Sequence, residues 1–275
     1  MKQSRRTFLK TTVAVSSAAA LARTPLAAAQ PAAVRDYYEL RAYRPKAGAP
    51  TAAIEGYLEK ALVPALDRSG VKHAGVFTEL AVDKKAGTSA PKPDTPLWVF
   101  IRHASLEAFA ATAAELNADP AVQAAGADYL GVAKASPAFD RIDSWLYRAF
   151  KSMPQIELPA FSKNRVPTRV FEMRDYESHN ERAALNKMAM FDDGETQLMR
   201  DLGMSPVFFG QAIAGPNLPH LRYFTSGPDL ASHLAGWAKF GPDPRWKKMA
   251  ADPQYKDNTS KNTARFLVPT AFSPI

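Results

Sequence analysis

Apolar and polar residues alternate along residues 37–43, a stretch rich in aromatic side chains, and this pattern is typical of a β-strand. In other stretches apolar residues recur every three or four positions, which predicts amphipathic helices. The elements predicted in the first half are strands at 37–43, 74–82, 97–103 and 139–146 and helices at 51–68 and from Ser105 onward. Their order of strand, helix, strand, strand, helix, strand is the ferredoxin-like arrangement.

The same order of patterns follows in the second half of the chain. Strands are predicted at 170–176, 207–213, 218–225 and 265–272, and helices at about 180–202 and 229–239. The sequence Asp-Asp-Gly at 192–194 marks a position where the first of these helices can break. A proline-rich stretch at 151–167 has few periodic apolar positions and is interpreted as a linker.

The two halves also resemble each other residue by residue. The strand segment 38–43 returns as 171–176, at an offset of 133 residues. After a longer loop in the first half the offset becomes 124, which aligns Arg141 with Arg265. A constant offset with one step of loop size is typical of a duplicated structural unit.

The repeat predicts the domain organisation and the fold class. We expect one repeat at 30–150 and another at 168–275, each a ferredoxin-like βαββαβ unit, and hence an α+β fold. Each unit has an antiparallel sheet with helices on one face only, so its bare face must be buried. Two such units in one chain can cover each other face to face or curl into a joint barrel.

Residues 1–29 are expected to be a removable leader. The segment 4–10 reads Ser-Arg-Arg-Thr-Phe-Leu-Lys, which is typical of a twin-arginine export signal, and an alanine-rich stretch follows it. The sequence therefore predicts export by the twin-arginine pathway to the periplasm or the medium. Because no other segment approaches the roughly 20 apolar residues of a membrane helix, no membrane span is predicted in the mature chain.

Charge and composition exclude several functions. The chain has 35 basic and 27 acidic residues, but five of the basic residues lie in the leader. The mature chain therefore has a net charge of about +3 and no basic cluster with interleaved aromatic residues, so nucleic-acid binding is not expected. The absence of cysteine excludes disulfides and thiolate chemistry. Serine hydrolase, P-loop and dinucleotide-binding motifs are also absent from the sequence.

Several short segments of the second half occur in a recognisable combination. They are Phe-Glu-Met-Arg-Asp-Tyr at 171–176, Lys-Met-Ala-Met-Phe at 187–191, Pro-Val-Phe-Phe-Gly at 206–210, Trp-Ala-Lys-Phe at 237–240 and Pro-Arg-Trp-Lys at 244–247. Together they resemble a NIPSNAP domain, and the first half is similar more loosely through 39–43 and 70–77. The resemblance implies a dimeric α/β-barrel fold, here formed within one chain. That superfamily also contains small haem-degrading and quinol monooxygenases, but the resemblance implies no particular activity.

Strand alternation places the repeated polar residues on one face of each opening strand. The residues predicted to line the barrel interior are Glu39, Arg41 and Tyr43 in the first half and Glu172, Arg174 and Tyr176 in the second. One interpretation is that they form salt bridges that join the two sheets, because buried charges must be paired. The other is a polar pocket for an anionic or phenolic ligand, in which the arginines clamp a carboxylate.

The five histidines show no spacing typical of a metal site, so no metal is predicted. His103 ends a strand that is expected to line the barrel, and it is the best candidate for a ligand-binding residue, a haem ligand or a general base. A surface or capping role is the alternative. His220, between Pro219 and Leu221, is interpreted as a turn residue. No cofactor is predicted.

Three functions remain open from the sequence. The first is binding of a small apolar or aromatic ligand in the barrel, where aromatic residues such as Trp98, Phe208 and Tyr223 are also explained by core packing. The second is a monooxygenase-like enzyme, by analogy of fold alone. The third is an interaction or assembly protein, including a homo-oligomer, that uses exposed sheet edges.

Overall fold

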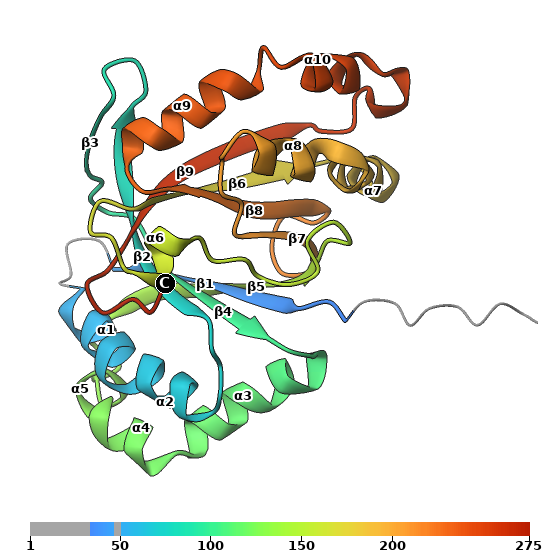
Figure 1. Ribbon diagram of the computed structural model, residues 1–275. Helices are drawn as coiled ribbons and strands as arrows, with labels where there is room; N and C mark the ends of the chain where they lie inside the picture. The colour runs from blue at the N-terminus through green and yellow to red at the C-terminus, as the bar shows by residue number, and fades with distance from the viewer. Residues whose placement is uncertain (1–33, 47–50) are drawn as a thin grey trace, which may run out of the picture. The chain divides into compact units, whose positions relative to one another are not determined.

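The computed structural model of the protein describes residues 34–46 and 51–275, and the predicted leader lies outside them. Figure 1 shows the strands of this part gathered between two groups of helices. The strands are β1 (Tyr37–Pro45), β2 (Ala74–Asp83), β3 (Thr88–Pro91), β4 (Leu97–His103), β5 (Phe139–Ala149), β6 (Val170–Glu177), β7 (Phe208–Ala214), β8 (His220–Gly227) and β9 (Lys261–Pro269). The helices are α1 (Ala52–Tyr57), η1 (Leu58–Leu62), α2 (Val63–Arg68), α3 (Leu106–Ala118), α4 (Pro120–Ala125), α5 (Ala127–Leu130), α6 (Ala160–Lys163), α7 (Glu181–Met190), η2 (Phe191–Glu195), α8 (Thr196–Asp201), α9 (Leu230–Phe240), α10 (Pro244–Ala251) and η3 (Pro253–Tyr255).

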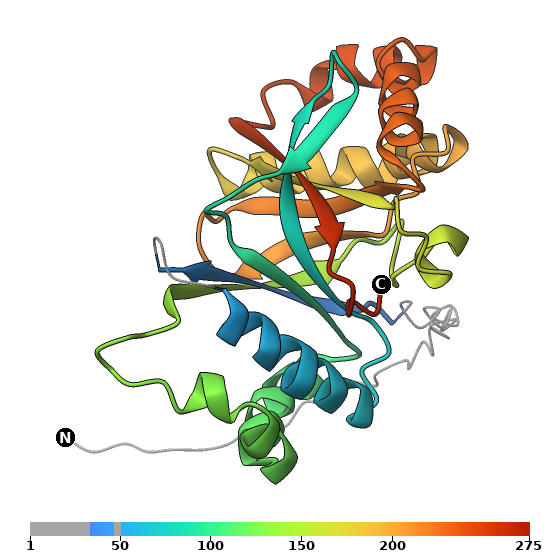
Figure 2. The same cartoon turned by 90° about the vertical axis from the view of Figure 1, so that its left-hand side faces the viewer.

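The strands form one antiparallel sheet that closes on itself. Its order is β3-β2-β4-β1-β5-β7-β8-β6-β9, and β9 also pairs with β2. Figure 2 shows this closure, with β2 in teal beside β9 in red. Among the described residues, the eight strands other than β3 therefore form a closed ring without a free edge. Strand β3 extends beyond this ring as the second arm of a hairpin with β2.

Each half of the barrel has the ferredoxin-like strand order. The order is β5-β1-β4-β2 in the first half and β9-β6-β8-β7 in the second, so the strand that opens each half is flanked by the third and fourth. Helices α1 to α5 cover the outside of the first half, and α7 to α10 cover the second (Figure 1). The α+β prediction of two ferredoxin-like units in a joint barrel is confirmed.

Local backbone features recur at the spacings seen in the sequence. The π-helical segments η1 and η2 begin at Leu58 and Phe191, 133 residues apart. Gly70 and Gly203 end the equivalent helices with φ of 79° and 73°, a left-handed conformation that glycine adopts readily. At the second spacing, Ser105 and Asp229 cap α3 and α9 with their side chains.

The predicted elements differ from the structure mainly at their ends and in the loops. The predicted strand at 139–146 extends to Ala149, and the last strand lies a few residues earlier than expected, in β9. The segment 83–96, between the second and third predicted strands, contains the short strand β3, which folds back on β2 as a hairpin. The helix predicted at 180–202 is kinked where the Asp-Asp-Gly sequence suggested a break, because Gly194 has non-helical backbone angles (φ 161°, ψ −23°) within the π-helical segment η2.

Aromatic and aliphatic side chains from both halves fill the lumen of the barrel. Fully buried members of this cluster are Tyr38, Leu40, Phe77, Phe100, Tyr147, Phe171, Met173, Phe208, Phe224 and Leu267. The rings of Phe208 and Phe224 are 4.9 Å apart between centroids. The middle of the barrel is thus a packed core, which excludes a large central ligand cavity in this structure.

The prediction of which strand face points into the barrel is wrong. Tyr43 packs against residues of α1 and η1, and Tyr176 packs against residues of α7 and η2, so both repeated polar rows lie between the sheet and the helices. Both faces of these strands are buried, and alternation alone cannot say which face the helices cover. The helix side suits the charged rows because the side chains of Arg41 and Arg174 remain partly exposed there, at 16% and 18%.

The end of the barrel where β2 begins is closed by residues 273–275. Ile275 is 2% exposed and belongs to the lumen cluster, and Ser273 Oγ accepts a hydrogen bond of 3.0 Å from Val76 N. A Cβ atom at Gly75 would lie 2.7 Å from the Ile275 side chain, so glycine is required for this close approach. Polar side chains gather at the opposite end.

Candidate functional site

A small cavity lies at the end of the barrel where β1 and β6 end and where β4, β8 and β9 begin. It has a volume of about 80 Å³, and we call it the mouth cavity. The residues that line it are Arg44, Trp98, Trp145, Asp175, Glu177, Asn217, His220, Arg222, Lys261, Thr263 and Arg265. Both halves of the chain contribute to it, because the closed barrel brings β1, β4 and β5 to the same rim as β6, β8 and β9.

Arg222 is the central cation of the mouth cavity. It lies opposite Asp175 in the β6–β8 pairing, is only 3% exposed and forms a salt bridge with the Asp175 carboxylate through Nε. Arg265 Nη1 binds the other carboxylate oxygen of Asp175 at 2.7 Å. One carboxylate therefore bridges two guanidinium groups, which keeps both in place at the rim.

Two tryptophans form the flat wall beside Arg222. The rings of Trp98 and Trp145 stack with centroids 5.9 Å apart, and the Arg222 guanidinium carbon lies 4.5 Å from the Trp145 ring centroid. Trp98 Nε1 donates a hydrogen bond of 3.0 Å to Glu79, which fixes its ring. Cation–π contacts stabilise the buried guanidinium without using its N–H donors.

One donor of Arg222 has no partner among the described residues. Its Nη1 atom is fully buried and makes no hydrogen bond. A buried polar group without a partner costs about 1–3 kcal/mol, and more when it is charged. An unpaired donor on a residue that lines a cavity is a feature expected of a site that receives an acceptor from a ligand.

The charges around the mouth cavity favour an anion. Its lining has four cationic side chains, those of Arg44, Arg222, Lys261 and Arg265, against the two carboxylates of Asp175 and Glu177. Lys261 is paired with Glu177 at 3.1 Å. Arg44 is also paired with Asp143 at 2.6 Å, and Arg265 lies 3.9 Å from Glu79, so carboxylates outside the lining offset part of this positive charge. The lining itself has more cations than carboxylates, which favours a negatively charged group.

His220 and Tyr147 form a hydrogen-bonded chain at the same rim. His220 Nδ1 lies 3.1 Å from the carbonyl oxygen of Asn217, which can only accept, so this nitrogen carries the proton. The Nε2 atom then accepts a hydrogen bond of 3.2 Å from the Tyr147 hydroxyl. Burial lowers the pKa of His220, the charge of Arg222 adds to this, and the imidazole is neutral at neutral pH. Burial also raises the pKa of Tyr147, which keeps its phenol protonated.

The predicted site residues of the first half come together, but away from the mouth cavity. Arg41 Nε binds Glu39 Oε1 at 2.5 Å, and His103 Nε2 lies 3.3 Å from Glu39 Oε2. Burial alone would raise the pKa of Glu39, but the hydrogen bond with His103 and the charge of Arg41 outweigh it and hold this pKa at about 2. His103 is buried against Phe109 of α3 and lines none of the cavities described in this section, so a haem has no room beside it.

A matching cluster forms in the second half. Arg174 Nη1 binds Glu172 Oε1 at 3.1 Å, and the guanidinium of Arg174 lies over the Trp237 ring at 4.5 Å. His233 Nε2 lies 2.8 Å from Glu172 Oε2, and Lys84 of the β2–β3 hairpin reaches the same carboxylate at 3.5 Å. The prediction that the two polar rows share one interior is therefore wrong, and their predicted role in ligand binding remains a prediction.

The sequence interpretation did not identify His233 or the residues of the mouth cavity. At the offset of 124, His103 aligns with Gly227 and Phe109 aligns with His233. The first half therefore has its histidine at the end of a strand, and the second half has its histidine on the helix that follows. A compensating exchange of this kind was visible in the alignment of the halves. The interpretation of His220 as a turn residue is wrong, because it begins β8 and is buried at the rim.

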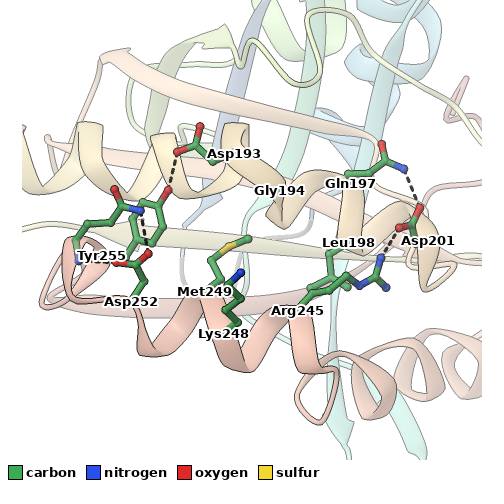
Figure 3. A pocket seen from close by; sticks show the side chains of 11 residues that line it. Asp193, Gly194, Gln197, Leu198, Asp201, Arg245, Lys248, Met249, Asp252 and Tyr255 are labelled. Carbon is green, nitrogen blue, oxygen red and sulfur yellow. Dashed lines mark hydrogen bonds and ion pairs between the residues drawn. The ribbon is translucent and has the colours of Figure 1, made fainter.

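A larger cavity than the mouth cavity is a surface groove of about 730 Å³ between α8 and α10 (Figure 3). Tyr255 donates a 2.6 Å hydrogen bond to Asp193 at one end, Arg245 binds Asp201 at 2.5 Å at the other, and Met249 lies between them. No side chain that lines this groove has a buried polar atom without a partner. The mouth cavity is therefore the stronger candidate for a binding site.

The closed barrel with helices outside defines an α+β protein with the dimeric α/β-barrel fold. A solved structure from Lactobacillus acidophilus NCFM, described as a "putative monooxygenase", shares this fold at 8% identity and a TM-score of 0.52, covering 86% of this chain and 94% of that chain. A protein of the same description from Fusobacterium nucleatum has 13% identity and a TM-score of 0.50, covering 86% and 93%. At these identities the similarity establishes the fold alone.

In the second half, residues 171–274 match the model of the NIPSNAP family. A NIPSNAP-like domain protein from Burkholderia xenovorans is 17% identical, with a TM-score of 0.36, and covers 40% of this chain and 91% of its own. Among curated proteins, none matches the sequence. Within residues 34–46 and 51–275, no helix has the length and apolar character to cross a membrane.

Proposed function

We propose that the protein binds a small carboxylate or similar anion at the mouth cavity. The observation that carries this proposal is that Arg222 lines the cavity and that its buried Nη1 atom has no hydrogen-bond partner among the described residues. A carboxylate oxygen is the acceptor that best matches a guanidinium donor, and the surrounding excess of positive charge favours it over a neutral group.

The walls of the cavity define the shape of the bound group. About 80 Å³ corresponds to the volume of roughly three water molecules, so the anionic head fits inside and the rest of a larger molecule extends outward. Trp98 and Trp145 offer flat apolar surfaces next to Arg222, which suits a planar or apolar group attached to the anion. The sequence predicted an apolar or aromatic ligand inside the barrel, and we now propose the barrel mouth as its location.

Calorimetric titration of the purified protein with acetate, benzoate and phosphate tests the proposal. We expect a carboxylate to bind and to raise the melting temperature, and Arg222→Gln to lower its affinity at least tenfold. Arg245→Gln is the matched control, because Arg245 is an exposed, paired arginine outside the mouth cavity. If none of the three anions binds the wild-type protein, or if Arg222→Gln folds and binds equally well, the proposal is wrong. Trp145→Leu provides a second probe that leaves the charges intact.

A monooxygenase-like activity is the second candidate function. The series of hydrogen bonds from the Asn217 carbonyl through His220 to the Tyr147 hydroxyl supports this activity. A neutral imidazole with a fixed tautomer can accept a proton that passes through the phenol. Oxygen consumption with a quinol would be measured for the wild-type protein and for His220→Gln. Uptake that the substitution abolishes would support the activity, and uptake no faster than in buffer would exclude it for that substrate.

We also propose that the chain is exported and that its two halves arose by duplication. The twin-arginine motif at residues 5–6 supports export. Cell fractionation of the wild type and of Arg5→Lys/Arg6→Lys tests it, since the variant is expected to stay inside the cell.

The paired π-helical segments and paired helix caps at two constant offsets support the duplication.

A further inference from the structure

A second cavity lies directly outside the rim of the mouth cavity. It is a groove of about 390 Å³ between α7 and the ends of β7 and β8, and we call it the rim groove. Its apolar walls are formed by Ala184, Leu185, Met188, Ala212, Leu218 and Pro219. This volume is within the range of small-ligand sites.

Two leucines at the rim groove are unusually exposed. Leu185 and Leu218 are 55% and 50% exposed, respectively, and the described part of the chain covers neither of them. Leu185 lies on α7 and Leu218 precedes β8, so distant segments of sequence present apolar surface to the same groove. Clustered apolar exposure beside a cavity is typical of a surface that a ligand or partner covers.

The rim groove and the mouth cavity share one wall. His220 lines both cavities, and of the three residues that precede it Asn217 lines the mouth cavity while Leu218 and Pro219 line the groove. A molecule whose anionic head reaches Arg222 would leave the mouth cavity past His220 and meet the groove. Because His220 is neutral, it places no charge beside an apolar chain that crosses the rim.

Charge determines the orientation of such a molecule. Glu181 is the one charged side chain that lines the rim groove, and it disfavours an anionic head there. The mouth cavity, in contrast, has an excess of cations and little room. The head is therefore expected at Arg222 and the apolar part over Leu185 and Leu218.

We infer that the ligand class is an amphipathic carboxylate, an organic acid whose head binds in the mouth cavity and whose apolar tail lies in the rim groove. This inference rests on the proposed function and specifies the ligand of the same site. The competing occupant of the groove is a second copy of this chain, in which case the leucines would form part of a dimer interface.

A chain-length series separates these cases. Titration of the wild-type protein with acetate, butanoate, hexanoate and octanoate is expected to show affinity rising with each methylene, by up to about fourfold per group. Leu185→Gln/Leu218→Gln should flatten this rise and leave acetate binding unchanged. Leu106→Gln/Leu130→Gln is the control, because both leucines are 42% exposed and lie in the first half, away from the groove.

Each result has a distinct meaning. Acetate binding without any gain along the series overturns the amphipathic ligand and leaves the proposed anion site in place. No binding of any acid overturns the proposed function itself. A dimer in light scattering that becomes a monomer in Leu185→Gln/Leu218→Gln, with the chain-length dependence unchanged, assigns the groove to a second copy and also overturns the inference.

Discussion

Arg222 and Trp98 occupy equivalent positions in the two halves and face each other at the barrel mouth, with the guanidinium carbon 5.6 Å from the Trp98 ring centroid. One half contributes the cation and the other contributes the aromatic surface. A barrel built from two similar units therefore has one asymmetric site at this end instead of two equal ones. The asymmetry comes from β4 and β8, which begin at the same rim.

The carboxylate of Asp175 holds both arginines at the mouth and also competes with an external anion. We expect Asp175→Asn to lower the free energy of unfolding by about 3–5 kcal/mol, because it removes one partner of a buried ionic network. The same variant should bind a carboxylate about tenfold more tightly, since two guanidinium groups are then available. Urea unfolding and calorimetric titration measure the two effects. Glu177→Gln is the control: Glu177 pairs with the exposed Lys261, so the free energy of unfolding should change by less than about 1 kcal/mol. If Asp175→Asn bound a carboxylate more weakly than the wild type, the assigned role of Asp175 would be wrong.

Glu39 should make the protein less stable in acid. Its pKa is about 2 in the folded protein, below the ordinary value of 4.5, so its stabilising effect is complete above pH 4.5 and is lost as the pH falls toward 2. The difference corresponds to at most about 3 kcal/mol. Urea unfolding between pH 2 and pH 7 should show a smaller pH dependence for Glu39→Gln than for the wild type. Equal slopes for the two proteins would show that Glu39 has an ordinary pKa.

The buried Lys187–Glu195 pair should be dispensable as a pair. Lys187 Nζ binds Glu195 Oε2 at 2.7 Å beneath α7, and burial raises the pKa of Glu195 while Lys187 opposes this rise. At the offset of 133 the first half has Ile54 and Leu62, both buried in its core. We expect Lys187→Ile alone to cost about 3–5 kcal/mol, and Lys187→Ile/Glu195→Leu to be neutral or stabilising. A double variant less stable than the single one, by urea unfolding, would contradict this expectation.

His233 packs so close to Gly227 that a residue with a Cβ atom does not fit at position 227 without a shift. A Cβ atom at Gly227 would lie 2.8 Å from His233 Cβ and 2.9 Å from the carbonyl oxygen of Asp229. Gly227→Ala should therefore destabilise the protein by about 1–3 kcal/mol, because α9 must shift. Gly241→Ala is the control, since nothing lies within 4 Å of its Cβ position, and it should change thermal stability little. Equal melting temperatures for the two variants would show that α9 adjusts freely.

Much of the fold follows from local patterns in the sequence. Alternation and helical periodicity predicted the ferredoxin-like order, and the offsets of 133 and 124 residues aligned structural equivalents such as Gly70 with Gly203. These features are local, because strand and helix periodicities and left-handed glycines depend on neighbouring residues. The grouping of Glu39 with Arg41, and of Glu172 with Arg174, is local for the same reason.

Only the tertiary structure decided which face of each strand points into the barrel and where the site lies. Tyr38 and Tyr43 are both buried, and their opposite environments depend on which side the helices cover. The mouth cavity joins Trp145 of β5 to Arg222 of β8, although β7 lies between these strands in the sheet. The sequence alone determined the order of strands and helices in each half and the pairing of charges within each polar row. The closure of the barrel determined which side chains meet, because contacts across a lumen depend on strand order and on the curvature of the sheet.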